Sequence, residues 1–521
     1  MRGIIGLLVF FSCSFLGRAQ VGLSPLNPIH TTLLQKSISS KVEIRQTAFA
    51  PYLMPLEELD SIYDADSENW KRKEYNSWLL RKIRSEHWIE VSKKDFVLKG
   101  DAVFNLETAR QSDDNGRRMY TNSRGYSFTG SIGEHFFFAT TFYENQSIFP
   151  NYMDSVVSAR GDFNNPADPE RGSVPGYGRW KPFNTSESYD YDYTLGTGYV
   201  GVALTDQSFI QFGHDKQFVG YGYRSLLLSD ASAPYTFLRL HGSFLKNKLT
   251  YTTTWAVLQY LERVAPVNYN NKEAMFRRLG ARFSYLHYQP KHWLGIGLFD
   301  GSTWDSQRNS HPSSIEFYSP HAFIFTEDGI RNHILGMNGH IDPFKFASIY
   351  GQLALNTRSG GKALQAGVKF TPLEGLMIQA EWNEVGSAFY YSSKNPSQNG
   401  IKVTEPFEAG TLTQDFYQHN DQSLGHPLGV GVQELTIRAY YRFRDFFVSG
   451  VYHSMKKGQP LFNASIDYFQ FEGGYIINPK SNMMIALGNI NRTERNGVSA
   501  LLDTYTYVAF RTSLLNRYLD F

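Results

Sequence analysis

The 521-residue sequence contains a single cysteine, Cys13, which lies inside the apolar run from Ile4 to Leu16. A basic residue precedes this run and small residues up to Ala19 follow it, so residues 1–19 are predicted to be a secretory signal peptide cleaved after Ala19. Cys13 would be a lipoprotein acceptor only if the apolar core of the signal ended unusually early. The processed chain would hold no cysteine, which excludes disulfides and thiolate metal sites.

The sequence also lacks an excess of either charge. It has 51 lysines and arginines against 49 aspartates and glutamates, and loss of Arg2 and Arg18 with the signal leaves 49 of each. Electrostatics therefore gives no case for a nucleic-acid partner. No apolar run of about 18 residues follows the signal, so a transmembrane helix is excluded.

The sequence is rich in residues that form membrane-spanning strands. Aromatic residues make up 15% of the chain, and 44 residues are glycine. An exported chain of this composition is typical of an outer-membrane β-barrel, in which lipid-facing and lumen-facing residues alternate and the average hydropathy stays modest. The predicted localisation is therefore the outer membrane of a Gram-negative bacterium, with outer-membrane lipid around the barrel.

Several segments show the alternation of period two that such strands require. Apolar residues alternate with polar or small ones over residues 363–370, 376–383 and 434–444. In the first segment Val368 falls on the apolar face and Gln365 on the other. Apolar residues on one face and charged residues on the other fit lipid outside and a polar interior. A soluble antiparallel sheet with one wet face is the alternative.

The lengths of the connections favour the membrane barrel. About 18 such segments follow one another from Val97 onward, with boundaries uncertain by a few residues. Every second connection is short, near residues 133, 205, 246, 289, 342, 372, 444 and 478. The others include long ones, at about 144–188, 217–234, 263–276, 302–330 and 386–431. Short periplasmic turns and long external loops predict a closed, antiparallel, all-β transmembrane barrel of about 18 strands over residues 96–521.

A segment of different composition, residues 20–95, precedes the barrel. Pro55 can begin one short helix, and Tyr75, Trp78 and Ile83 recur at helical spacing in a second helix. We expect this helical segment at the periplasmic end of the barrel. It is either a plug in the mouth of the barrel or a small helical pair that packs on itself.

The stretch from Gln217 to Tyr235 alternates glycines with aromatic residues and continues with a leucine run and a proline. It lacks the lysine spacing and the following helix of a phosphate-binding loop. It resembles the signature of the Wzi-like capsule assembly outer-membrane proteins. The matching residues are Gly213, Gly220, Gly222, Ser225, Leu226, Leu228, Ser229, Ala231 and Pro234. Val219 stands where that signature has tryptophan. We expect the stretch to form a structural corner at the extracellular rim or to fold inward as a cap.

The end of the sequence, "LLNRYLDF", resembles the ends of relatives in this family that are associated with gliding motility. The strand-like segment that closes on Phe521 also resembles the signal by which the barrel insertion machinery selects its clients, although Arg517 departs from the usual apolar alternation. The family resemblance implies an 18-stranded barrel that holds surface polysaccharide, in capsule assembly or attachment or in glycan-linked gliding motility. Other envelope proteins are further possible partners. A diffusion channel or uptake porin is the alternative, because a barrel of 18 strands encloses an aqueous lumen unless it is filled.

Aromatic residues flanked by polar ones in the region 177–192 are the candidate glycan contacts. They are Tyr177, Trp180, Phe183, Tyr189, Asp190, Tyr191 and Asp192. Trp180 is the better candidate because it lies in the loop, whereas Tyr189 and Tyr191 are more typical of an aromatic girdle at the membrane interface.

The sequence supports a catalytic site less well than it supports a glycan-binding site. His214 and Asp215 are adjacent on one strand and point to opposite faces. His419 and His426 share a loop with Asp415 and Asp421 at no spacing that specifies a metal, so solvated loop residues are the favoured interpretation. We therefore predict no catalytic residues, no metal and no cofactor, and the barrel enzyme is the least favoured of the three functions.

Overall fold

The computed structural model describes the chain in segments. These are residues 20–27, 48–56, 73–112, 118–158, 172–183, 190–263, 276–305, 330–392, 397–398, 401–402, 416–458, 464–497, 499–513 and 516–521. The predicted signal peptide lies outside the described residues. Among those described, the helices are α4 (Trp78–Arg84) and α5 (Asn151–Ser158), and neither is long and apolar enough to span a membrane.

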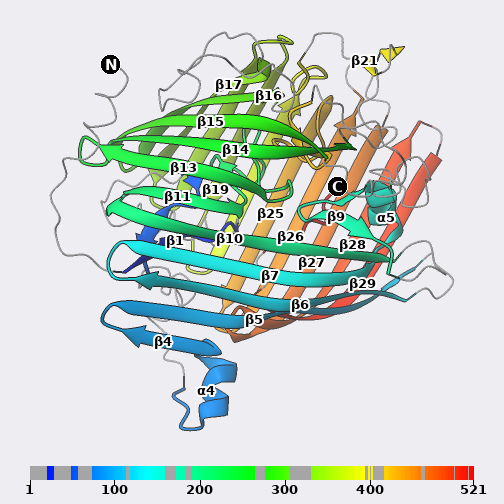
Figure 1. Ribbon diagram of the computed structural model, residues 1–521. Coiled ribbons are helices and arrows are strands. Elements are labelled where there is room, and N and C mark those ends of the chain that lie inside the picture. The colour runs from blue at the N-terminus through cyan, green and yellow to red at the C-terminus, as the bar shows by residue number, and fades with distance from the viewer. Residues whose placement is uncertain are drawn as a thin grey trace.

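The described strands form a closed antiparallel barrel with a wall of 18 strands (Figure 1). The wall strands are β5 (Phe96–Gln111), β6 (Met119–Ile132), β7 (Phe136–Ile148), β10 (Tyr191–Thr205), β11 (Ser208–Asp215), β13 (Tyr235–Phe244), β14 (Leu249–Arg263), β15 (Phe276–Lys291), β16 (Leu294–Asp305), β17 (Ile330–Phe344), β18 (Ala347–Asn356), β19 (Lys362–Phe370), β20 (Leu376–Val385), β25 (Val432–Phe443), β26 (Phe446–Lys457), β27 (Ala464–Asn478), β28 (Met483–Asn496) and β29 (Ser499–Thr512). The barrel closes where β29 pairs with β5, from Tyr505 opposite Gln111 to Thr512 opposite Phe104. The predicted closed antiparallel barrel of 18 strands is confirmed.

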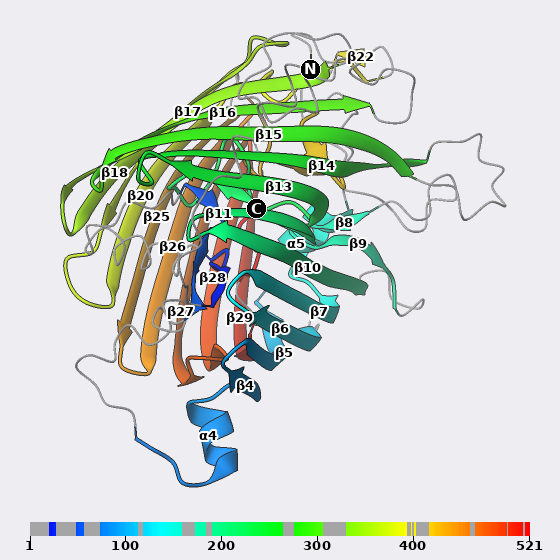
Figure 2. The ribbon, with the colours of Figure 1, turned by 60° about the vertical axis from the view of Figure 1, so that its left-hand side comes forward.

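The connections sort by length as the sequence predicts. One end of the barrel carries short turns, such as residues 133–135, 206–207, 444–445 and 479–482. The opposite end carries the long connections, including 149–190, 216–234 and 386–431. By the arrangement of bacterial barrels, the short-turn end is periplasmic and the long-loop end is extracellular. Figure 2 shows the turns and loops at opposite ends of the strands.

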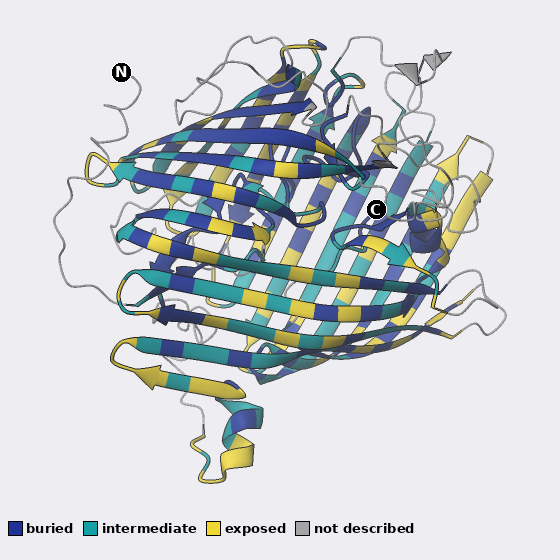
Figure 3. Ribbon diagram, in the orientation of Figure 1, coloured by how far each residue is buried: buried dark blue, intermediate teal, exposed yellow. Residues whose placement is uncertain are grey.

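The strand faces alternate between buried and exposed residues, as the bands on the wall strands in Figure 3 show. Val368 is 46% exposed on the outer face of β19, whereas Gln365 is 1% exposed on the inner face. At the periplasmic end, Phe344, Phe346 and Phe370 form an exposed aromatic cluster with ring centroids 5.3 and 5.4 Å apart. Exposed apolar residues with an aromatic cluster at one rim match the lipid-facing surface of a membrane barrel.

The helix α4 lies beside the end of the barrel that carries the short turns (Figure 1). Asn478, at the end of β27, donates hydrogen bonds to the backbone oxygens of Lys82 and Glu86 at 3.0 and 2.8 Å. Trp78 and Leu79 are 59% and 50% exposed. These two side chains are therefore not buried in the mouth of the barrel. Residues 57–72, where the first helix is predicted, lie outside the described residues.

Extended segments from the N-terminal region enter the barrel instead. The short strands β1 (Val21–Leu23) and β3 (Leu53–Pro55) pair with each other, and Val21, Leu23 and Leu53 pack against the inner wall. The strand β2 (Phe49–Ala50) pairs with β12 (Phe218–Val219) of the long loop 216–234. The backbone groups of these short strands therefore have hydrogen-bond partners inside the lumen, either in one another or in the long loop.

A buried arginine fixes this N-terminal segment to the wall. Arg239, on the inner face of β13, is 0% exposed. Its guanidinium donates to the backbone oxygens of Pro51 and Phe49 at 2.7 and 3.1 Å and lies 4.4 Å from the centre of the Phe49 ring. The buried charge is held by carbonyl dipoles and a ring face rather than by a carboxylate.

We predict that replacement of Val368 by arginine destabilises the barrel by about 2–4 kcal/mol, because it places a charge on the lipid face near the middle of a strand. Unfolding of the reconstituted protein in denaturant, followed by heat-modifiable gel mobility, measures the effect. Val368→Leu is the matched control and should leave stability within about 0.5 kcal/mol. An equal loss for both variants would mean that β19 is assigned to the wrong face.

Candidate functional site

The loop 216–234, which carries the sequence signature, folds inward and fills the middle of the barrel. Leu226, Leu227 and Leu228 are 0% exposed and belong to the main hydrophobic cluster. The Ser225 hydroxyl donates to the backbone oxygen of Val219 and accepts from the backbone N–H groups of Leu227 and Leu228. Of the two placements that the sequence allows, the inward one is therefore confirmed.

The other signature residues hold the shape of this loop or of its ends. Ser229 accepts from the backbone N–H of Ala231, and the Pro234 carbonyl accepts from a ring nitrogen of His419 at 3.0 Å. Gly213, within β11, lies against the β10 backbone at Tyr199. These positions support the interpretation of the signature as a structural motif.

Gly220 and Gly222 of the signature allow close approaches that a side chain would block. Gly220 has a φ of +146°, and its N–H donates to the Ala48 carbonyl at 2.7 Å. A Cβ on Gly222 would lie 2.4 Å from a Glu381 carboxylate oxygen and 2.8 Å from the Arg224 carbonyl oxygen. Glycine is needed at residue 222 because the loop backbone touches a wall carboxylate there.

Arg224, in the same loop, joins three parts of the molecule. Its guanidinium lies 3.0 Å from Glu434 on β25 and 3.0 Å from Asp520 in the segment 516–521. Its backbone N–H and that of Tyr223 donate to Glu381 on β20 at 3.0 and 2.7 Å. The loop, the wall and the final segment therefore meet in one buried network of charges.

Two histidines extend this network. His426, in the loop 386–431, lies 2.8 Å from Glu434, and His453 on β26 lies 3.3 Å from Glu434 and 3.4 Å from Asp520. His426 is 0% and His419 is 4% exposed. The interpretation of these loop histidines as solvated is therefore wrong, because the loop folds into the lumen. No group of three or more potential ligands could hold a metal ion in the described part of the chain.

The final segment also lies inside the lumen. The strand β29 ends at Thr512, and Phe521 is buried, with its carbonyl oxygen accepting from Arg492 at 3.0 Å. Arg517 points to Glu107 at 2.7 Å, which explains why it departs from a lipid-facing alternation. The expectation that the last strand runs to Phe521 is wrong. Phe521 accordingly lacks the strand-end position that the resemblance to an insertion signal requires.

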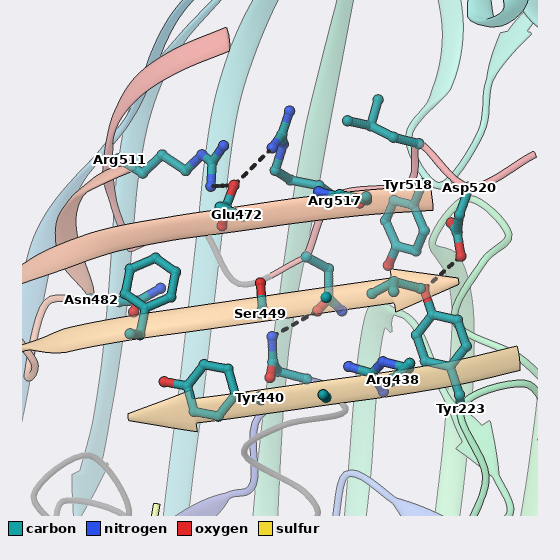
Figure 4. Close-up of a pocket in the computed structure, with 18 of the residues that line it drawn as sticks. Tyr223, Arg438, Tyr440, Ser449, Glu472, Asn482, Arg511, Arg517, Tyr518 and Asp520 are labelled. Atoms are coloured by element: carbon teal, nitrogen blue, oxygen red, sulfur yellow. Dashed lines mark hydrogen bonds and ion pairs between the residues drawn. The ribbon is translucent and has the colours of Figure 1, made fainter. Parts of the chain in front are cut away.

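A cavity of about 260 Å³ lies between this final segment and the periplasmic half of the wall (Figure 4). Its lining extends from Asn482, in the short turn 479–482, to Asp520 in the network described above. Arg438 and Tyr440 line it from β25, and Arg511 reaches it from β29. The cavity therefore combines arginines with tyrosines at the periplasmic end of the lumen.

A second feature is a groove of about 310 Å³ at the extracellular end. It is formed by β9 (Gly178–Lys181) and by the upper parts of β6, β7 and β10. The lining residues are Arg124, Glu144, Gln146, Arg179, Trp180, Lys181, Asp192, Tyr193 and Thr194. An indole beside carboxylates, an amide and cations offers a flat apolar face and hydrogen-bonding groups of both kinds.

The structure distributes the candidate glycan contacts over several environments. Trp180 is half-buried, with its ring 4.8 Å from that of Tyr191, and Asp192 lies 3.5 Å from Lys181 in the groove. Tyr177 packs edge-on against Tyr193 inside the barrel at 5.1 Å.

Of the remaining candidates, Asp190 and Tyr191 are buried, and the Tyr191 hydroxyl donates to Asp154 of α5 at 2.5 Å. Tyr191 thus lies inside the lumen rather than in a lipid-facing girdle. Phe183 is 38% exposed. Tyr189 lies outside the described residues. The structure therefore brings Trp180 and Asp192 together in the groove and leaves the other described candidates out of it.

Sequence reasoning missed the residues of the central network. Arg224, Glu381 and Glu434 were visible as charges, the first within an apolar loop and the others on the inward faces of predicted strands. Their pairing joins residues 157 and 210 positions apart, which no local pattern reports.

The wall, the filled lumen and the polar features at both ends define the class of this protein as an outer-membrane β-barrel with an occupied lumen. No family model matches the chain, and no curated protein matches its sequence.

Among solved structures, the chain is similar to Wzi of Escherichia coli, an outer membrane protein involved in group 1 capsule assembly and described as a carbohydrate-binding β-barrel. The TM-score is 0.52 at 13% identity, over 95% of this chain and 100% of that one. Matches to OccK7 and OprD of Pseudomonas aeruginosa have TM-scores of 0.40 and 0.42 at 12% and 10% identity. They cover 80% and 83% of this chain and 99% of each of those chains. At this identity the likeness to Wzi establishes the fold alone.

We predict that Gly222→Val lowers the yield of folded barrel, because the new side chain would collide with Glu381 and with the loop backbone. The amount of heat-modifiable, compact protein in outer-membrane fractions measures assembly. Gly450→Ala is the control, since a Cβ there would meet only the Gln470 carbonyl oxygen, at an ordinary contact distance of 3.9 Å. Normal assembly of the valine variant would contradict the close fit of the loop.

The docking of the final segment should depend on pH through Asp520. Burial alone would raise the pKa of Asp520, but the charge of Arg224 and the bonds from His453 and Tyr223 lower it to about 2. The unfolded value is about 3.9. A depressed carboxyl pKa stabilises the docked segment above about pH 4, and this stabilisation is lost as the pH falls toward 2. Hydrogen exchange of the peptide 516–521 should therefore show equal protection at pH 7 and pH 5.

In the same measurement, Asp520→Asn should be less protected at both pH 7 and pH 5, because it removes one partner of a buried ion pair, a loss of about 3–5 kcal/mol. Intrinsic exchange rates are corrected with the unfolded peptide at each pH. Loss of wild-type protection already between pH 7 and pH 5 would contradict the assigned ion pair.

Proposed function

We propose that this protein is an outer-membrane barrel with a closed lumen that holds surface polysaccharide at its extracellular end. The role is capsule assembly or attachment, or a glycan-linked accessory role in gliding motility. The filled lumen is the observation that carries this proposal, because a barrel blocked by its own loops suits a scaffold for a surface polymer better than a path for solutes.

The blockage involves segments from both halves of the chain. Strand β2 pairs with β12 in the lumen, and the hydroxyls of Tyr390 and Tyr417 donate to the carbonyls of Leu226 and Leu227 at 2.9 and 3.1 Å. Leu226, Leu227 and Leu228 are 0% exposed, as residues of a protein core are. This interior supports a lumen without a continuous water path.

The extracellular groove supports a glycan contact. Trp180 offers an indole, while Asp192, Glu144 and Gln146 offer acceptors for sugar hydroxyls, and Arg179 offers a donor. The groove lies where a polymer outside the cell would reach the barrel. Trp180 and Asp192 are therefore the residues that we assign to glycan contact.

Two resemblances agree with this role. Wzi, which has a similar fold, is described as carbohydrate-binding. The signature at residues 213–234 resembles that of the Wzi-like family, and the end of the sequence resembles those of relatives associated with gliding motility. A diffusion channel is the second candidate, and the cavities of about 260 and 300 Å³ in the periplasmic half of the lumen favour it.

Planar-bilayer recording separates the two functions. We expect negligible conductance from the intact protein, because the lumen is filled. Arg239→Ala is the internal comparison, since it removes the bonds that fix residues 49 and 51 to the wall and should produce measurable open events. Stable porin-like conductance of the intact protein would favour the channel instead.

Whole-cell glycan retention tests the groove. We expect Trp180→Ala to reduce retained surface polysaccharide several-fold with normal barrel assembly, because the indole face is lost. Trp293→Ala, at a periplasmic turn, is the matched control and should retain polysaccharide normally. Unchanged retention in the Trp180 variant would refute the glycan contact.

A further inference from the structure

The periplasmic cavity of Figure 4 has a distinct electrostatic character. It is lined by five arginines, at positions 224, 438, 442, 511 and 517, and by three carboxylates, at positions 230, 472 and 520. Burial in the lumen also raises the pKa of Asp230, which favours its neutral form. In the lining itself, arginines therefore outnumber carboxylates.

Most of the surrounding acidic groups are already engaged. Glu472 lies 2.7 Å from Arg511 and 3.5 Å from Arg517, and Asp520 lies 3.0 Å from Arg224. Glu107, behind the cavity wall, accepts Arg517 at 2.7 Å. These pairs account for three of the five arginines.

Arg438 differs from those three. It is 6% exposed, and its Nη1 donates to the neutral amide of Gln379 at 3.2 Å, while its guanidinium lies 4.2 Å from the centre of the Tyr223 ring. Among the described residues it forms no ion pair within 4.0 Å, although Asp520 and Glu381 lie near enough to act on its charge, and its buried Nε has no hydrogen-bond partner there. The Glu381 oxygens instead accept from the backbone of Tyr223 and Arg224.

The buried guanidinium of Arg438 favours binding of an anion in the cavity. Arginine remains charged in proteins, and its planar donors match carboxylate and phosphate oxygens. A buried guanidinium with no carboxylate in direct contact is stabilised further by a ligand that supplies a counter-charge. The arginine is held in place by Gln379 and Tyr223, so its orientation is set before any ligand enters.

The rest of the cavity limits the size and character of the ligand. A volume of about 260 Å³ lies just below the range of roughly 300–1,000 Å³ typical of drug-sized ligands. Tyr440 and Phe447 contribute a stacked pair of rings on one side, and Ser449 contributes a hydroxyl. Rings beside hydroxyl and guanidinium donors suit a small ring-shaped polar body better than an apolar chain.

We propose that this cavity binds a monosaccharide-sized anion, a sugar carrying a carboxylate or a phosphate group, and that Arg438 is its main anchor. The ligand enters from the periplasmic end, past the turn 479–482. This site is separate from the extracellular groove that contains Trp180. Failure of one site therefore leaves the other assignment standing.

Titration calorimetry on the purified full-length protein in detergent tests this site, with glucuronate, glucose 1-phosphate, neutral glucose and inorganic phosphate as probes. At least one sugar anion should bind with 1:1 stoichiometry and at least tenfold more tightly than glucose or inorganic phosphate. Equal binding of glucose would overturn the anion assignment. Equal binding of inorganic phosphate would overturn the sugar assignment.

Arg438→Gln should weaken binding of the sugar anion at least tenfold. Arg444→Gln is the matched control, because Arg444 lies in the exposed turn 444–445 outside the cavity lining, and it should bind normally. Heat-modifiable mobility checks that both variants fold. Unchanged affinity in a folded Arg438→Gln variant would overturn the proposal.

A second variant keeps the test decisive if Arg438→Gln fails to assemble. Ser449 faces the cavity from β26, and its register partner Tyr440 lies two residues from Arg438 on β25. Ser449→Asp should supply the missing carboxylate, raise thermal stability and abolish binding of the sugar anion. Sugar-anion binding that persists at wild-type affinity in Ser449→Asp would show that the ligand does not occupy this cavity.

Discussion

The interior of this barrel depends on one buried cation. The guanidinium of Arg224 joins Glu434 on the wall to Asp520 in the final segment, while the backbone beside it is held by Glu381. A buried charge that loses one partner leaves the other unsatisfied, so these groups are stable only together. The inward course of the loop 216–234, the position of the segment 516–521 and the burial of His426 all follow from this junction.

Polar side chains on the inner face of the wall bind the backbone of the enclosed loop. Gln352, on β18, accepts from the Leu226 backbone N–H and donates to the Val219 carbonyl, and Gln365 donates to the Arg224 carbonyl. Wall side chains therefore provide the hydrogen-bond partners that the buried backbone of the loop needs. The polar inner face serves as a template that fixes the backbone of the loop.

Much of the wall could be predicted because lipid imposes it. A strand in a bilayer must alternate, and short turns must gather at one end, so Val368 and Gln365 are assigned to faces from local spacing alone. The contents of the lumen could not be predicted, because an inward glutamate such as Glu434 has the same pattern whether it meets water or Arg224. The groove was partly visible in Trp180 and Asp192, whereas Arg438 appeared only as one inward charge among several. Contacts across the lumen depend on distant segments, and sequence spacing does not encode them.

The seam between β29 and β5 has a consequence for biogenesis. The segment 48–56 precedes the first wall strand, the segment 516–521 follows the last, and both lie within the wall that these two strands close. Arg239 binds the first of these segments and Arg224 binds the second. Closure of the cylinder and burial of the two segments are therefore coupled, because the wall and the segments satisfy each other's buried polar groups. Once enclosed, the two segments stabilise the closed barrel from inside.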